Sequence, residues 1–540
     1  MPVFKSKIVT SSERFAKNRA DMLALVDKLK ELNARAPALS ASKKERFEKR
    51  GQLLPRERLG RLLDPGMPYL EIGNLAGYLL DTKKEARSIP GSTIMAGIGY
   101  ISGARCVIVT DDSGIKAGAL TVGGGYRLQR AQEIALAQKL PFIHLVESAG
   151  GDLMNYTVEG FFQGGALFAN LARLSKAGIP VISILHGSST AGGAYMPGLS
   201  DYVIAVKGGG KAFLAGPPLL KAATGEIATE DELGGAEMHA TVSGLAEYLV
   251  NDDAQAVALL RDVIDNLDWP SRAPQADEIG FNEPIYSPDE IAGVVPTDYK
   301  SPFDVREVVA RIVDGSEFTD FKANYGISTV CIQSKIFGYP VGIIGNNGPI
   351  DTQGATKAAQ FIQLMDQADT PVIFLQNTTG YMVGKEFERA GMIKHGSKMI
   401  QAVTNMSVPR ITLMIGASFG AGNYGMCGRG YDPDFLLTWP NAKAGVMGGE
   451  QAATVMDIVA QGRAARTGVE IDPQIAAQQK AMLTHIFDSQ SDAFYTSGHC
   501  QDDGMIDPRD TRKVLGFLLA TVWEGRRRTV KENSFGIARM

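Results

Sequence analysis

Two glycine-rich segments, each directly after an apolar run, contain residues whose backbone could do chemistry. SSTAGGAYMPG at 188–198 follows VISILHG, and ASFGAGNYGMCG at 417–428 follows ITLMIG. Small residues let a substrate approach the backbone, and the first N–H groups of a following helix would point at it. N–H groups fixed in this way stabilise a developing oxyanion, typically by a few kcal/mol each. The alternative is a tight strand-to-helix turn. A single glycine pair is weak evidence, but two matched segments favour function.

No metal-binding or phosphate-binding motif competes with these segments, because HExxH and Walker A patterns are absent from the sequence. His144 stands inside an apolar run and is expected to pack in the core, whereas the role of His186, just before the first cluster, is left open. For His239 a structural role is favoured over pocket lining. Glu147 and Ser148 precede a glycine turn, where capping of the next helix is the simpler explanation.

Two oxyanion sites in one chain narrow the kind of reaction. A hydratase that acts on one thioester needs one such site. A carboxyltransferase needs two, one for an acyl-CoA enolate and one for the ureido oxygen of biotin. The pair of clusters therefore favours group transfer between two substrates that each develop an oxyanion.

The clusters belong to an internal duplication. Residues 141–150 (PFIHLVESAG) match 371–380 (PVIFLQNTTG), and 180–195 match 409–424, at offsets of 230 and 229 residues. Weaker echoes link 61–66 with 311–316 and 213–216 with 446–449. Two blocks in one order at almost one offset indicate two copies of one domain. The predicted divisions are a helical arm at 1–49, a first domain at 50–268, a linker at 269–301 and a second domain at 302–540.

Each copy alternates helical and apolar segments. Helices are predicted at 127–140 and 165–177 in the first copy, and at 355–368 and 396–406 in the second. Continuous apolar runs between them are typical of strands that are buried on both faces of a largely parallel sheet. The predicted fold class is therefore α/β, with two homologous domains.

The composition of the chain limits the classes of protein to which it can belong. The chain has 540 residues, 44% hydrophobic and 21% charged, with a formal net charge of −4. This balance argues against nucleic-acid binding. No run approaches the ~18 apolar residues of a membrane span, and the N-terminus resembles neither a secretory signal nor a transit peptide. A cytoplasmic enzyme is expected. The four cysteines are isolated, so neither a zinc ribbon nor a disulfide framework is expected, and no metal is predicted.

At these residues the sequence resembles the carboxyltransferase (β) subunits of biotin-dependent acyl-CoA carboxylases. The motifs are GSSTAGGAY at 187–195, FLAGPPLLKAATGE at 213–226, LGGAEMH at 233–239, NTTGYMVG at 377–384, GASFGAGNYGMCGR at 416–429 and VMGGEQAA at 446–453. The resemblance covers nearly the whole chain and is strongest to the methylcrotonyl-CoA and geranyl-CoA branch. It implies a duplicated crotonase-like (ClpP/crotonase) ββα superhelix, with the acyl-CoA on the first domain and biotin on the second.

The resemblance also implies a set of site residues. Backbone N–H groups would hold the acyl-CoA thioester oxygen, and the residues that supply them are Gly192, Gly193, Ala117 and Gly118. The biotin ureido oxygen would face a second set, in which the last two shape the turn: Ala421, Gly422, Phe419 and Gly420. Carboxybiotin would release CO2, its ureido anion would take a γ proton from a conjugated enoyl-CoA, and the resulting enolate would attack CO2.

Two further predictions concern the acyl-CoA. Arg127, Arg130 and Lys221 are candidates for the CoA phosphates by position, with solvated surface charge as the equal alternative. Methylcrotonyl-type enzymes carry a bulky phenylalanine where Gly164 aligns in this sequence. A glycine there would open the acyl pocket and suit a longer chain such as geranyl.

The chain has neither an AMKM-like biotinyl-lysine motif nor an ATP-binding glycine loop. An α subunit with biotin carboxylase and biotin carboxyl carrier domains is therefore implied, with a homo-hexamer of this chain in an α6β6 complex. In this family the active site lies between the first domain of one subunit and the second domain of another.

Several alternatives stay open. A biotin-dependent decarboxylase of the glutaconyl-CoA type would share the fold, and a propionyl-CoA or long-chain acyl-CoA carboxylase would share the reaction. A non-catalytic scaffold has no need for open backbone donors. A hydratase needs no second domain and would show a pair of glutamates as general bases.

Overall fold

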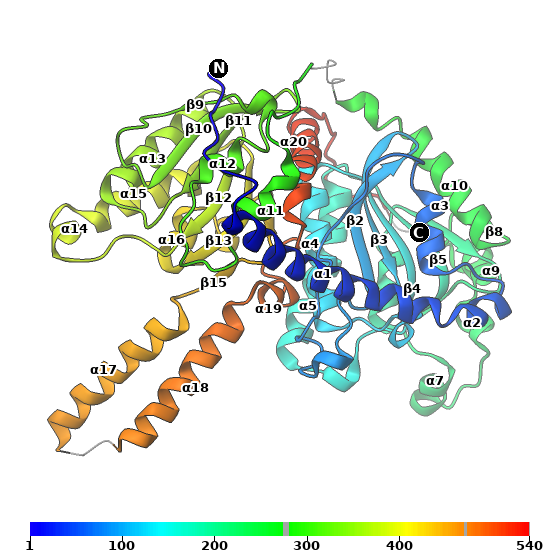
Figure 1. The fold of residues 1–540 in the computed structure, drawn as a ribbon. Helices are drawn as coiled ribbons and strands as arrows, with labels where there is room; N and C mark the ends of the chain where they lie inside the picture. The colour runs from blue at the N-terminus through cyan, green and yellow to red at the C-terminus, as the bar shows by residue number, and fades with distance from the viewer. Residues whose placement is uncertain (274–279, 469–471, 539–540) are drawn as a thin grey trace. The chain divides into compact units, whose positions relative to one another are not determined.

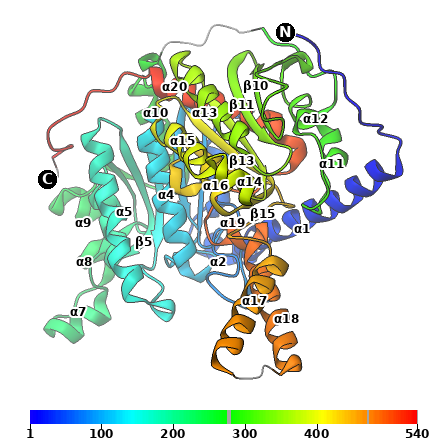
Figure 2. The same cartoon turned by 90° about the vertical axis from the view of Figure 1, so that its left-hand side faces the viewer.

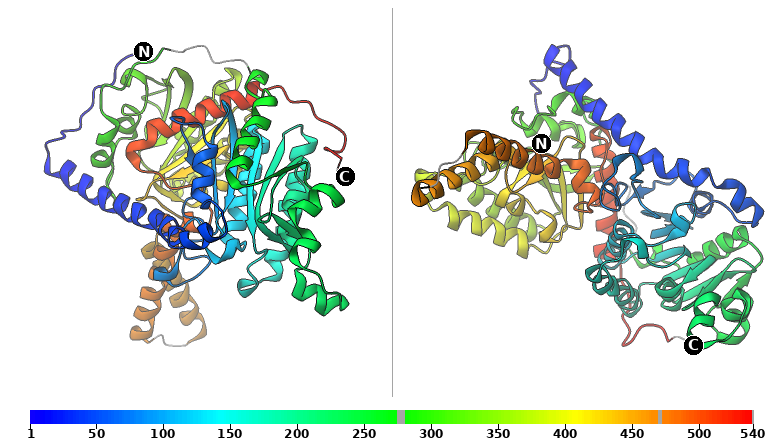
Figure 3. Two further views of the ribbon diagram at one scale, coloured as in Figure 1. Left: turned by 90° about the vertical axis from the view of Figure 1, so that its right-hand side faces the viewer. Right: turned by 90° about the horizontal axis from the view of Figure 1, so that it is seen from below.

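The computed structural model describes residues 1–273, 280–468 and 472–538. The chain divides into two compact units. The N-terminal unit holds residues 30–277, 498–500 and 520–540, and the C-terminal unit holds 1–29, 278–497 and 501–519. The long helix α1 (Glu13–Ala41, Figure 3) and α20 (Thr511–Arg527) contribute residues to both. The predicted domain boundaries stay a prediction, and residues 274–279 of the predicted linker lie outside the described ranges, as do 469–471 and 539–540 of the predicted second domain.

The N-terminal unit is built on an eight-stranded sheet in the order β1-β2-β3-β4-β5-β6-β8, with β7 paired to β5 (Figure 1). All pairs from β3 onward are parallel, while β1–β2 and β2–β3 are antiparallel. The strands are β1 Leu70–Glu71, β2 Ile94–Ile101, β3 Ala104–Asp111, β4 Phe142–Ser148, β5 Val181–Thr190, β6 Tyr202–Val206, β7 Lys211–Phe213 and β8 Tyr248–Val250. The helices are α2 Lys44–Lys49, α3 Pro55–Leu62, α4 Val122–Gln138, α5 Val158–Lys176, α6 Tyr195–Gly198, α7 Pro217–Thr224, α8 Glu230–Gly234, α9 Ala236–Met238 and α10 Asp253–Asn266.

The C-terminal unit repeats this plan with a seven-stranded sheet in the order β14-β13-β12-β11-β10-β9, with β15 paired to β13. The strands are β9 Thr319–Asp320, β10 Thr329–Ile336, β11 Tyr339–Asn346, β12 Val372–Thr378, β13 Arg410–Phe419, β14 Phe435–Thr438 and β15 Lys443–Gly445. The helices are α11 Ile291–Val294, α12 Val305–Val309, α13 Thr352–Gln367, α14 Lys385–Arg389, α15 Met392–Asn405, α16 Gly420–Gly425, α17 Gly449–Thr467, α18 Pro473–Ser491 and α19 Ala493–Gly498.

The duplication extends to single hydrogen bonds. Leu120 donates its N–H to the Gly150 carbonyl at 2.7 Å, and Ile350 donates to the Gly380 carbonyl at 2.9 Å. Both pairs stand at the predicted offset of 230 residues. Strands β3, β4, β5 and β6 correspond in order to β11, β12, β13 and β14. The expectation of a duplicated α/β fold with largely parallel sheets is confirmed.

The predicted helices are present, but all four of them begin earlier than expected. Helix α4 begins at Val122, where the Thr121 side chain accepts the Gly124 N–H. Three glycines in its first turn hid this start, because glycine weakens helix propensity. Helix α13 begins in the same way with Asp351 as its cap. Threonine and aspartate are preferred at this position because their oxygens satisfy an N–H that has no partner in the helix.

One part of the plan differs between the copies. After β7 the chain forms short helices and returns to pair Lys211 with Gly235, whereas after β15 it forms the long antiparallel helices α17 and α18 (Figure 2) before Lys443 pairs with Asp492. None of the helices in the described ranges combines the length and apolar character that a membrane crossing requires.

Candidate active site

Both glycine clusters begin with the same backbone turn. Strand β5 ends at Thr190, and Ala191 follows with a φ of 52°. Strand β13 ends at Phe419, and Gly420 follows with a φ of 55°. These two left-handed residues occupy equivalent positions in the duplication. A left-handed alanine costs roughly 1–2 kcal/mol, and such strain is kept where surrounding structure holds it in place. The turn sends the chain from the strand into a helical segment in each copy.

The predicted donors lie at the start of these helical segments. Gly192 and Gly193 belong to a 3-10 helix at Ala191–Ala194, and Gly422 with Ala421 belongs to α16. Gly192 and Ala421 are exposed. The first N–H groups of a helix have no partner within it. Gly192 and Ala421 therefore lie at accessible positions, whereas Gly422 is buried, and the role of these residues as oxyanion donors stays a prediction.

The loop at Ala117–Gly118 comes next to the first cluster. Lys116, Ala117 and Gly118 have successive φ angles of 45°, 53° and 71°. The Ser148 hydroxyl donates to the Gly118 carbonyl at 2.9 Å, and a Cβ built on Gly193 would lie 3.6 Å from the Ser148 Cβ. The structure thus brings Gly118 and Gly193 close to Ser148. The Gly118 N–H itself donates to the Ile115 carbonyl at 2.9 Å, so this N–H group closes the turn.

An apolar pocket of about 300 Å³ lies between α4 and α5 and is lined by Gly164. Other lining residues include Tyr126, Phe161 and Leu167. A Cβ built on Gly164 would meet nothing within 4 Å, so the glycine faces open space. Phe168 lies one helical turn further along α5, and its ring is 3.4 Å from a Cβ built on Gly192. The pocket therefore lies one helical turn along α5 from the ring that contacts the first cluster.

The three candidate cations have different positions. Lys221 is exposed on α7, and Arg130 is half-buried and lies 3.6 Å from Glu133. Arg127 is buried and donates to the backbone carbonyls of Ile72, Gly91, Ile94 and Ala96.

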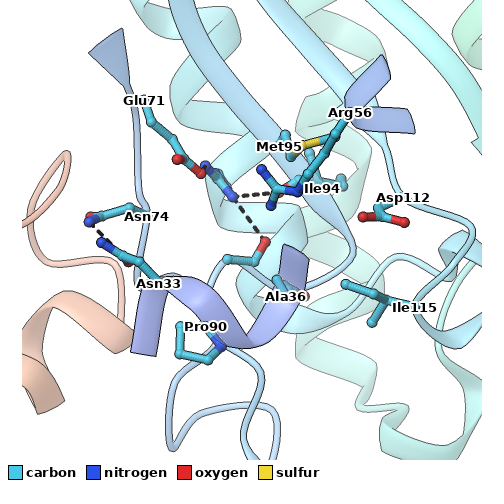
Figure 4. Close-up of a pocket in the computed structure, with 13 residues that line it drawn as sticks. Asn33, Ala36, Arg56, Glu71, Asn74, Pro90, Ile94, Met95, Asp112 and Ile115 are labelled. Carbon is cyan, nitrogen blue, oxygen red and sulfur yellow. Dashed lines mark hydrogen bonds and ion pairs between the residues drawn. The ribbon is translucent and has the colours of Figure 1, made fainter. Parts of the chain in front are cut away.

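Arg127 also forms an ion pair with Glu71 at 2.7 Å. Both residues line a cavity of about 30 Å³, and Figure 4 labels Glu71, Asn74 and Arg56 among the residues around it. A cavity of that size holds water but not a phosphate. The geometry gives Arg127 a structural role, so its predicted contact with CoA is not supported. A solvated surface charge, the alternative, does not describe it either.

Beneath the first cluster lies a buried charged network that the sequence did not reveal. Arg58 contacts Glu147 at 2.6 Å and Asp253 at 2.9 Å. Asp253 in turn lies 2.6 Å from His186 Nδ1. A Cβ on Gly187 would lie 2.5 Å from the Glu147 Cγ. The network therefore packs directly against the start of the glycine cluster.

The pKa values in this network follow from burial and contacts. Burial alone would raise the pKa of Asp253, but hydrogen bonds from His186 and the Leu53 N–H, with the Arg58 charge, lower it to about 2. Burial and the Arg58 guanidinium lower the pKa of His186, although Asp253 and Glu147 oppose that change. His186 is therefore expected to be neutral at pH 7. An acidic residue inside an apolar run, as at Glu147, was the available signal for such a network.

The remaining histidine candidates have structural contacts. His144 Nε2 lies 3.1 Å from Asp111, inside the sheet. His239 contacts the Ala212 carbonyl at 2.8 Å and the Ser243 hydroxyl at 2.7 Å. Within the described residues, no group of three or more His, Cys, Asp and Glu side chains is arranged to hold a metal ion. The predicted absence of a metal remains a prediction.

Comparisons with known proteins agree with this geometry. A family model described as the carboxyl transferase domain matches residues 46–536. The probable biotin-dependent acyl-coenzyme A carboxylase beta2 subunit of Mycobacterium tuberculosis is 47% identical over 519 residues, covering 95% of this chain and 96% of that protein. The mitochondrial methylcrotonoyl-CoA carboxylase beta chain of Dictyostelium discoideum is 43% identical over 524 residues, covering 96% and 88%. The crystal structure of the P. aeruginosa geranyl-CoA carboxylase beta subunit is similar with a TM-score of 0.93 and 50% identity, covering 100% of both chains.

Proposed function

Because this chain belongs to the carboxyl transferase family and is the carboxyltransferase subunit of a biotin-dependent acyl-CoA carboxylase, in the methylcrotonyl-CoA and geranyl-CoA branch, we propose that its substrate is an acyl-CoA with a geranyl-type chain. The observation that carries this choice is the apolar pocket lined by Gly164. Its volume of about 300 Å³ and the open space at Gly164 leave room for a prenyl unit beyond a methylcrotonyl group.

On the acyl-CoA side, the proposed donors are Gly192 and Gly193 with the loop at Ala117. Their N–H groups would donate hydrogen bonds to the thioester oxygen as negative charge develops on it. Fixed N–H groups stabilise this charge without reorganising, so they lower the barrier to proton loss at the γ carbon. Lys221, exposed on α7, remains a candidate for a CoA phosphate.

On the biotin side, the second cluster has features that fit a flat ureido ring. Ala421 is exposed, and the Phe419 ring packs against Tyr299 with centroids 5.3 Å apart. A Cβ on Gly420 would lie 3.3 Å from the Val446 carbonyl, so only a small residue fits the turn. When bound, carboxybiotin supplies CO2 and a nitrogen that accepts the substrate proton. We propose that Ala421 and Gly422 hold its ureido oxygen.

Partners follow from the family. An α subunit with biotin carboxylase and biotin carboxyl carrier domains would deliver the carboxylated biotin to this chain. We further propose a homo-hexamer of this chain within an α6β6 complex, in which the first cluster of one subunit faces the second cluster of another. Purified alone, the chain should be an oligomer without ATP-dependent carboxylase activity.

The substrate proposal is tested by Gly164→Phe in the α/β complex, with ATP-dependent bicarbonate fixation measured on geranyl-CoA and 3-methylcrotonyl-CoA. The added ring should exclude the longer chain, so turnover of geranyl-CoA should fall by about 10-fold or more relative to 3-methylcrotonyl-CoA. Gly165→Phe is the matched control, because Gly165 is exposed on the same helix and its Cβ would also meet nothing within 4 Å.

Equal losses on both substrates would remove the reason for a geranyl-type substrate. Fixation by the wild-type complex with propionyl-CoA alone would favour that branch. Decarboxylation of a carboxylated acyl-CoA without any ATP-dependent fixation would favour the glutaconyl-CoA type of decarboxylase.

A further inference from the structure

The second glycine cluster is held by a buried network of neutral side chains. Gln376, at the end of β12, accepts a hydrogen bond from the Ser418 hydroxyl at 2.5 Å. Asn423, inside α16, donates to the same hydroxyl at 2.7 Å. Gln376 also donates to the Met426 carbonyl at 2.7 Å, just beyond α16. One glutamine from the neighbouring strand thus holds residues on both sides of α16.

The packing around this network leaves its side chains little room to move. Gln376 and Ser418 are buried. A Cβ built on Gly428 would lie within bonding distance of the Asn423 amide, so only a glycine leaves space for it. A Cβ on Gly422 would lie 2.8 Å from the Gly380 Cα, which shows how closely α16 rests on the end of β12.

The first copy has the same serine but not its partners. Val146 and Ala194 occupy the positions of Gln376 and Asn423. Ser189, the counterpart of Ser418, is buried, and its hydroxyl has no hydrogen-bond partner among the described residues. Replacing Gln376 by valine and Asn423 by alanine would therefore give the second copy the side chains that the first copy has at these two positions.

We propose that Gln376 and Asn423 are positioning residues that fix the Ala421 and Gly422 N–H groups for the biotin ureido oxygen. This inference rests on the proposed function of the second cluster. An acyl-CoA is large, and its remote contacts can help to position its thioester. The biotin ring is small and arrives on a carrier, so the donors that meet it must be fixed by the protein.

The test is the double variant Gln376→Val/Asn423→Ala, with Asn423→Ala alone as a milder form in case the double variant does not fold. The reverse partial reaction, from carboxylated acyl-CoA to free biocytin, reports on each substrate separately. The expected result is a fall of about 10-fold or more in kcat/KM for biocytin, with the KM for the acyl-CoA unchanged within about 2-fold. Hydrogen exchange should show faster exchange of the 420–425 amides.

Thr412→Val is the matched control. Thr412 is buried on β13 and donates to the Cys427 carbonyl at 2.7 Å, so it supports the end of the same cluster and has no hydrogen bond to Gln376 or Asn423. It should leave the biocytin parameters near wild type. The inference is overturned if the control and the double variant lose biocytin kcat/KM equally, or if the double variant keeps wild-type parameters.

The proposed function can fail separately. If the wild-type complex carboxylated no acyl-CoA, the proposed function would be wrong. Unchanged hydrogen exchange of the 420–425 amides in the double variant would instead overturn the positioning role alone.

Discussion

Beneath the first glycine cluster lies a buried group of charged side chains, Arg58, Glu147, Asp253 and His186, whereas beneath the second lies a group of amides and a hydroxyl. The left-handed residue after the strand and the bridge at the neighbouring loop are nevertheless the same in both copies. Duplication has preserved the backbone that presents the N–H groups and changed the side chains that support it. The proposed function predicts such a difference, because the proposed donors are backbone groups and only their surroundings would need to differ between two unlike oxyanions.

The largest effect is expected from closing one cluster. Gly193→Val places a branched side chain in front of the first cluster's donors. Its Cβ would lie 3.0 Å from the Ser189 hydroxyl, which can rotate away, so the fold should remain. Bicarbonate fixation by the α/β complex should fall by about 100-fold or more. Gly198→Val, at a glycine with open space on α6, is the control. Near-wild-type fixation by Gly193→Val would show that this cluster is not an oxyanion site.

A second comparison concerns the basic residue at the same position of α4 and α13. Arg127 donates hydrogen bonds to backbone carbonyls and forms an ion pair with Glu71. Lys357 is also buried, but its Nζ has no hydrogen-bond partner among the described residues. Burial lowers the pKa of Lys357. Arg127→Met leaves a carboxylate and several carbonyls without their donor and should cost about 3–5 kcal/mol.

Lys357→Met removes a poorly compensated amine and should be neutral or slightly stabilising. Thermal unfolding of the two variants, compared with wild type, measures both effects. Equal destabilisation by the two substitutions would contradict the structural difference between the copies.

The smallest expected effect is on the pH dependence of folding stability, and it concerns only the first copy. The folded state lowers the pKa of His186, so the unfolded chain binds the proton more readily. The resulting contribution to stability is fully present above the ordinary histidine pKa of about 6.5 and is lost as the pH falls below it. His186→Asn keeps a donor toward Asp253 but does not titrate. Its Tm should fall less than that of wild type between about pH 7.5 and pH 5.5, by about 2–4 °C. Arg58, Asp253 and Glu147 are present in both proteins, so parallel Tm curves would refute the assignment to His186.

The sequence predicted the duplication, both clusters and the helix interiors, because these depend on local patterns that recur at one offset. It did not predict the role of Arg127, since burial of a basic residue depends on which carbonyls the fold brings to it. The pair of Arg58 and Asp253 joins residues 195 positions apart, and nothing local marks either one. Helix starts were misplaced where glycines fill the first turn, as at Val122.

The most direct test of the two-cluster account mixes subunits. Gly193→Val closes the first cluster and Ala421→Val narrows the second, so each variant alone should be inactive in fixation by the α/β complex. If each site pairs the first cluster of one subunit with the second of another, random mixing places both intact clusters together in some sites. Co-expressed variants with two different affinity tags, purified through both tags, should then recover about a quarter or more of wild-type activity. Mixed oligomers without any recovered activity would contradict the account.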